Sequence, residues 1–104
     1  MNFKVEYLSR AISDLKDAMA HISNELGMPK AASELVENIV HDIESLTDFP
    51  YSHPAYTPIQ PLKHDYRKMV VQNYSVFYWV DEQSKIVTIA RVLYNRRNFL
   101  SILR

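Results

Sequence analysis

The stretch of residues 65–94, DYRKMVVQNYSVFYWVDEQSKIVTIARVLY, decides the fold of this chain. Three runs within it are rich in Val, Ile, Tyr, Phe and Trp, which are the residue types enriched in β-strands. Asn73 and residues 81–84 separate the runs and are typical of turns. We therefore predict an antiparallel meander of three strands, at residues 65–72, 74–81 and 85–94.

The chain before the meander predicts one strand and two helices. Residues 3–7 alternate between apolar and charged side chains, as in a half-buried strand. Ser9 offers an N-cap for a first helix, Gly27 a left-handed C-cap, and Pro29 the first turn of a second helix. Apolar residues recur three or four positions apart in both helices: Ile12, Leu15, Met19, Ile22 and Leu26, then Ala32, Val36, Ile39, Ile43 and Leu46, with Leu35 and Val40 beside them.

The remaining segments are a loop and a short tail. Residues 49–64 hold four of the five prolines, a density that excludes a helix or a central strand; these are Pro50, Pro54, Pro58 and Pro61. Residues 95–104 can form a terminal helix with Phe99, Ile102 and Leu103 on its apolar side.

The predicted fold is a single α+β domain, residues 1–104, in the order β-α-α-β-β-β. A helical hairpin packs on one face of a mainly antiparallel four-stranded sheet, and a short C-terminal helix follows. The hairpin can cover only one face, so we expect the other face to be partly open or covered by a partner.

The charge of the chain is zero overall and strongly divided along its length. The 12 Lys and Arg residues balance the 12 Asp and Glu residues, which excludes an overall basic nucleic-acid binder. Residues 1–62 nevertheless hold nine acidic and four basic residues, whereas residues 63–104 hold three acidic and eight basic ones. The meander and tail are therefore the part of the chain suited to an acidic partner or to RNA.

Few residue patterns in the chain suggest chemistry. It contains no cysteine and a single glycine, so thiol chemistry and glycine-rich phosphate loops are excluded. The four histidines lack metal-ligand spacing, and we expect no metal and no cofactor. The N-terminal residues have no apolar core of a signal peptide and the longest apolar run is far too short to cross a bilayer, so we expect a cytoplasmic protein that does not contact membranes.

Arg91 is the most informative single residue, because it interrupts an apolar strand. A charged side chain in that position either points to an open sheet face or meets a carboxylate. Tyr94, Arg96 and Arg97 follow it where the last strand gives way to the tail. Arg67 and Lys68 lie on the first strand of the meander and point to opposite faces.

The sequence resembles the RelE/ParE superfamily, which comprises toxins of type II toxin–antitoxin systems. The resemblance rests on VEYLSRAISDL at 5–15, ESLTDFP at 44–50, YRKMVVQNYSVFYWVDE at 66–82 and RVLYNRRNF at 91–99. It implies a small α+β toxin held inactive by an antitoxin, in a toxin–antitoxin hetero-oligomer. RelE-like members cleave mRNA on the ribosome without a metal, whereas ParE-like members inhibit DNA gyrase.

Two departures from the nuclease pattern place the chain closer to the ParE-like group. Ser75 stands where the nucleases have an arginine, and no tyrosine follows Tyr94 in the tail. The resemblance thus implies a gyrase inhibitor that binds targets or partners through Arg91, Tyr94, Arg96, Arg97 and Phe99. As alternatives, the chain is a ribosome-dependent mRNA endonuclease using Arg67, Lys68, Arg91 and Arg96, or a degenerate toxin that binds only its antitoxin.

Overall fold

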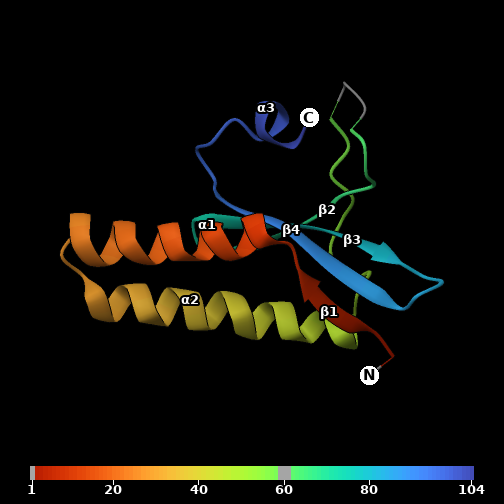
Figure 1. Ribbon diagram of the computed structural model, residues 1–104, viewed down its shortest axis with the longest axis horizontal. Coiled ribbons are helices and arrows are strands. Elements are labelled where there is room, and N and C mark those ends of the chain that lie inside the picture. The colour runs from red at the N-terminus through yellow and green to blue at the C-terminus, as the bar shows by residue number, and fades with distance from the viewer. Residues whose placement is uncertain (1, 59–61) are drawn as a thin grey trace.

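The computed structural model describes residues 2–58 and 62–104 of the chain (Figure 1). Its elements follow in the predicted order. They are β1 (Lys4–Tyr7), α1 (Ser9–Ala20), the π-helical turn η1 (His21–Glu25), α2 (Pro29–Glu44), the 3-10 turn η2 (Ser45–Thr47), β2 (Arg67–Val71), β3 (Tyr74–Asp81), β4 (Ile86–Tyr94) and α3 (Phe99–Leu103). In the described part of the chain, no helix has the length and apolar character needed to cross a membrane.

The four strands form one sheet in the order β1-β4-β3-β2. The meander is confirmed, because β2 pairs with β3 and β3 with β4, both antiparallel. Strand β1 adds to the far side of β4 in parallel, with Tyr7 opposite Ile89 at its end. The β3–β4 register shifts between Phe77, which faces Arg91, and Tyr78, which faces Ile89. Ala90 is therefore the extra residue of a β-bulge, which twists β4 just before Arg91.

The helical hairpin covers one face of the sheet, and the two helices run antiparallel side by side (Figure 1). Small residues of α1 are buried against the sheet, namely Ala11 and Ala18, with Asp14 between them. The apolar stripe predicted for α1 is thus partly wrong, since Ile12 and Leu26 are exposed. The physical reason is that α1 packs closely on β4, and only small side chains fit there. The stripe predicted for α2 is largely correct, with Ala32, Leu35, Ile39, Ile43 and Leu46 buried.

The turn between the two helices has the predicted residues at its ends, but the start of α1 does not. The N-cap of α1 is Leu8, and no side chain caps the helix, so the predicted Ser9 cap is wrong. Gly27 has φ +65 and ends the hairpin's first arm in the left-handed conformation, as predicted. The backbone N–H of Met28 donates to the carbonyl of Ile22, and Pro29 opens α2.

The second face of the sheet is covered in part by the chain itself and is otherwise open, as expected. Val70 of β2, whose neighbours Met69 and Val71 are buried in the hairpin-side core, stays exposed on it. Helix α3 contributes Phe99, Ile102 and Leu103, and they pack with Tyr66 and Phe77 of the sheet side. Figure 1 shows α3 well separated from the α1–α2 hairpin. A ten-residue tail with three apolar side chains on one side was enough to form this second small core.

The proline-rich segment is an extended loop that lies along the outer edge of β2, as predicted for its described residues. Ala55 forms an isolated bridge with Arg67, and the backbone N–H of Lys68 donates to the carbonyl of Pro54. The buried hydroxyl of Tyr78 donates to the carbonyl of Pro50 at 3.0 Å. These contacts cover an edge that would otherwise expose unpaired backbone groups. Pro61 lies outside the described residues.

Candidate functional site

Asp14 of α1 joins the hairpin to the sheet by three hydrogen bonds. Its carboxylate accepts from Nε of Arg91 at 2.8 Å, from Nη2 of Arg91 at 2.9 Å, and from the backbone N–H of Val92 at 2.8 Å. Strand β1 ends opposite Ile89, so beyond that point β4 has no neighbouring strand on this side. The Asp14 carboxylate takes the place of the missing strand as the acceptor for β4.

This arrangement decides between the two predictions for Arg91. Its side chain meets a carboxylate, and the exposed fractions of the two side chains are 17% for Arg91 and 9% for Asp14. The hydrogen bond that Arg91 donates to Asp14 is the main cause that raises the pKa of Arg91, and burial opposes it. The charge of Arg91 is therefore paired within the molecule.

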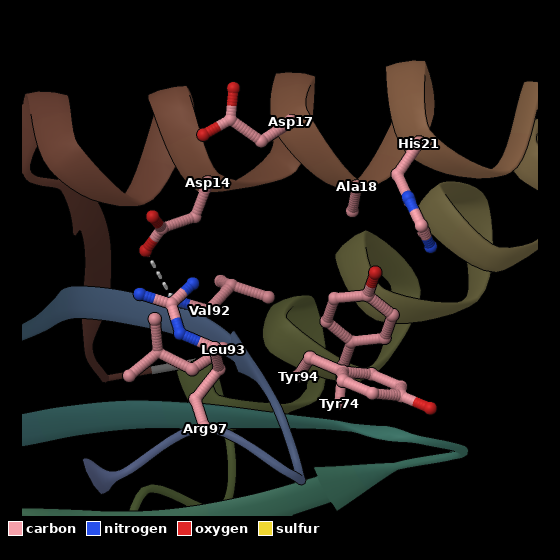
Figure 2. A pocket seen from close by; sticks show the side chains of 9 residues that line it. All are labelled: Asp14, Asp17, Ala18, His21, Tyr74, Val92, Leu93, Tyr94 and Arg97. Atoms are coloured by element: carbon pink, nitrogen blue, oxygen red, sulfur yellow. Dashed lines mark hydrogen bonds between the residues drawn. The ribbon is translucent and has the colours of Figure 1, made fainter. Parts of the chain in front are cut away.

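A pocket of about 220 Å³ opens between α1 and the end of β4 (Figure 2). Asp17 and His21 line it from the helix, and Tyr74, Tyr94 and Arg97 line it from the sheet and tail. The ring centres of the two tyrosines lie 5.5 Å apart. Figure 2 shows the side chain of Arg97 pointing back toward the carboxylate of Asp14. The pocket offers both signs of charge and aromatic surface, which suits a protein segment better than a bare phosphate chain.

Three of the five predicted binding residues lie at the surface beside this pocket. Tyr94 has an exposed fraction of 39%, and Arg96 and Arg97 are exposed in the turn that follows β4. Phe99 lies elsewhere, since its ring packs 4.8 Å from that of Phe77 in the second core. Arg91 is held by Asp14 as described above. The structure thus groups Tyr94, Arg96 and Arg97 and separates Phe99 and Arg91 from them.

The four nuclease candidates lie in different surroundings. The Nη1 atom of Arg67 donates to the carbonyl of His53 at 2.7 Å, on the helix side of β2. Lys68 points to the other face, where its Nζ atom lies 5.7 Å from the ring centre of Phe99. Arg91 pairs with Asp14, and Arg96 lies in the turn after β4. The structure does not gather these four side chains around one point.

Ser75 occupies a closed position. Its exposed fraction is 1%, and its hydroxyl donates to Oδ1 of Asn95 at 2.5 Å. This hydroxyl therefore links β3 to the start of the tail. The position at which the resembling nucleases have an arginine carries neither a cation nor an open surface here.

Sequence reasoning missed Asp14, Asp17 and His21 as residues of this region. Asp14 could have been found, because the spacing of Ala11, Asp14 and Ala18 places a carboxylate within a stripe of small residues on one helix face. Asp17 and His21 lie on the same side of the helix, one and two turns after Asp14. No sequence pattern marks them as site residues. Within residues 2–58 and 62–104, no three His, Asp or Glu side chains gather as a metal site.

Comparison with known proteins gives the family. Residues 5–99 match the family described as the ParE toxin of type II toxin–antitoxin system, parDE. The chain belongs to this family. A search of curated proteins finds no significant match. The family match places the chain in the RelE/ParE superfamily, on the ParE-like side, as the sequence predicted.

Solved structures agree on the fold. The chain is similar to a chain of the chromosomal ParDE TA system from P. aeruginosa, with a TM-score of 0.71 and 19% identity over 89% of this chain and 96% of that one. It is also similar to a chain of the archaeal RelE–RelB complex from Pyrococcus horikoshii OT3, with a TM-score of 0.65 and 17% identity over 93% and 99%. A chain of the toxin–antitoxin complex RelBE2 from Mycobacterium tuberculosis gives a TM-score of 0.59 and 19% identity over 90% and 99%.

Proposed function

We propose that this ParE-family toxin inhibits DNA gyrase by binding it and that a cognate antitoxin neutralises it. The observation that carries the proposal is the family match over residues 5–99. Two features of the site support it over RNA cleavage. Arg91 forms an ion pair with Asp14, and Ser75 is buried with its hydroxyl bonded to Asn95. Two positions that a nuclease would use to bind phosphate therefore make structural contacts instead.

The surface proposed to meet gyrase is the group of Tyr94, Arg96 and Arg97. These three side chains are exposed at the end of β4, next to the pocket lined by Asp17 and Tyr74. Arginine and tyrosine are enriched at protein interfaces, because both combine a large contact area with hydrogen-bonding groups. Their position on a turn held by a paired strand also means that little order has to be gained on binding.

The antitoxin is proposed to cover apolar surface on the hairpin. A shallow groove of about 420 Å³ runs between α1 and α2 and is lined by Ile12, Leu15, Met19 and Val36. The similar solved structures are toxin–antitoxin complexes, which supports such a partner. The exposed fraction of Ile12 is 43%, a large apolar side chain left in water by the fold itself.

A supercoiling assay with purified gyrase tests the proposal. The wild-type toxin is expected to block supercoiling, and added antitoxin is expected to restore it. The double variant R96A/R97A is expected to weaken inhibition at least tenfold, because interface arginines that contribute strongly cost about 2 kcal/mol or more when truncated. The variant K16A/K30A, which removes the same charge from exposed helix positions, serves as the matched control.

Two results would contradict the proposal. Normal supercoiling at a large excess of toxin would exclude gyrase as the target. Equal loss of inhibition in R96A/R97A and K16A/K30A would show that only net charge matters. The RelE-like alternative is tested in parallel by primer extension on ribosome-bound mRNA, where cleavage together with normal supercoiling would replace the gyrase proposal.

A further inference from the structure

A second pocket, of about 210 Å³, lies at the edge of β4 beyond the end of β1, mostly on the second face of the sheet, and shares no residue with the pocket of Figure 2. It opens between the start of α1, residues 63–66, the middle of β3 and β4, and the end of α3. Its lining contains no acidic side chain. The basic side chains that line it come from four separate parts of the chain: Arg10, Lys63, His64, Arg91 and Arg104.

Aromatic rings form one wall of this pocket. The rings of His64 and Trp79 are stacked, with centres 3.8 Å apart and planes 8° apart. Tyr66 meets Trp79 edge to face at 5.7 Å. A flat aromatic wall of this kind is a surface on which a nucleobase stacks.

Tyr66 supplies a hydroxyl beside the basic groups of the pocket. Only 7% of the residue as a whole is exposed, but its hydroxyl makes no hydrogen bond to the described residues. Because no buried side-chain polar atom lacks a partner in the described part of the chain, this hydroxyl is open to solvent. Burial raises the pKa of Tyr66 while the nearby charge of Arg91 opposes the shift, so the hydroxyl remains protonated at neutral pH. A protonated and unpaired hydroxyl next to a guanidinium is a donor suited to an anionic oxygen.

The start of α1 adds positive potential at the same place. Leu8 and Arg10 of this helix start line the pocket. The twelve-residue helix has no side-chain cap and no acidic residue in its first turn, so the positive end of its dipole is not compensated locally. Asp14 neutralises Arg91 and Asp17 lies within reach of its charge, but neither carboxylate lines the pocket.

We propose that this pocket binds a nucleotide, with the phosphate held by Arg10, Lys63 and the Tyr66 hydroxyl at the start of α1. The base stacks on the ring pair formed by His64 and Trp79. The basic side chains favour an anionic ligand. The aromatic wall favours a ligand that also carries a flat ring, so a nucleotide should bind more tightly than inorganic phosphate. The inference goes beyond gyrase inhibition, since it concerns another pocket and another class of ligand.

Trp79 makes the proposal directly testable, because it is the only tryptophan of the chain. Titration of the full chain with 5′-AMP is expected to change Trp79 fluorescence saturably. Adenosine and inorganic phosphate, each lacking one half of the ligand, are expected to bind at least tenfold more weakly. A single-stranded oligonucleotide that binds through a longer surface while 5′-AMP does not bind would overturn the nucleotide assignment.

Variants separate the site from general charge effects. R10A/K63A is expected to weaken 5′-AMP binding at least tenfold and to keep the far-ultraviolet circular dichroism of the wild type. K16A/K30A removes two exposed charges elsewhere and is expected to bind normally. Absence of a saturable change with the wild type, or equal affinity of the wild type and R10A/K63A, would refute the proposal. The measurement needs no gyrase, so its result is independent of the proposed function.

Discussion

Replacing Asp14 with alanine removes the contact on which the junction of hairpin and sheet depends. The change deletes all three hydrogen bonds that the carboxylate accepts, two from Arg91 and one from the backbone of Val92. It leaves the Arg91 guanidinium, which is only 17% exposed, without its counter-charge. It also leaves the N–H of Val92 without an acceptor in a buried part of β4.

The expected loss in the free energy of unfolding is about 3–5 kcal/mol, the range measured when one partner of a buried ion pair is removed. The unpaired N–H of Val92 makes the upper part of this range the better expectation, since an unsatisfied buried donor costs about 1–3 kcal/mol. Domains of this size are stable by only about 5–15 kcal/mol, so D14A should lose a large share of its stability.

Urea unfolding followed by Trp79 fluorescence measures the effect, with the midpoint and slope compared between variants. D17A is the matched control, because Asp17 is an exposed carboxylate one turn further along α1 and should change stability by less than about 0.5 kcal/mol. If D14A does not fold, the double variant D14L/R91L keeps the test open, since an apolar pair of similar volume restores much of the stability. A loss below about 1 kcal/mol for D14A, or a loss equal to that of D17A, would show that the pair does not hold the junction.

Two further predictions concern the backbone and the buried phenol. Gly27→Ala should cost about 1 kcal/mol by urea unfolding, because an added Cβ meets no atom within 4 Å and only the left-handed φ of +65 opposes it; a stabilised variant would contradict this. Burial raises the pKa of Tyr78 to about 12 from 10.0, so ionisation favours the unfolded chain and stability should fall as pH rises from 10 toward 12. In Tyr78→Phe the free energy of unfolding should decrease less over this pH range. If it decreases as much as in the wild type, Tyr78 is not the cause of the decrease.

Most of the fold could be predicted from local patterns. The bounds of β3 were predicted as observed and those of β4 within one residue, because Asn73 and residues 81–84 mark the turns of the meander. The bounds of β1 were predicted within one residue from the alternation of apolar and charged residues alone. Gly27 and Pro29 placed the hairpin turn, since each residue has a strong backbone preference that tertiary contacts rarely override. The stripe of α2 was nearly correct because this helix meets the core with one regular face.

The candidate site was less accessible to such patterns. The exposed group of Tyr94, Arg96 and Arg97 was predicted from composition and from the family resemblance, and these residues do lie together. For Arg91 the sequence left two possible environments, an open sheet face or a carboxylate partner. It could not choose between them, because the choice depends on which residue of another element faces Arg91. Phe99 was proposed as a contact for partners, yet its ring packs against Phe77 and Tyr56, which the tail reaches only by folding back over the sheet.

The amino-acid sequence by itself determined the order of elements, the family and the division between an acidic hairpin and a basic sheet and tail. These properties depend on residues that are close together in the sequence and on the amino-acid composition of each segment. The tertiary structure alone decided where Arg91 points. The bulge at Ala90 and the early end of β1 bring Arg91 and the free edge of β4 to Asp14, 77 positions away from Arg91 in the chain. No local pattern encodes such a pairing, because it arises only when α1 packs on the twisted sheet.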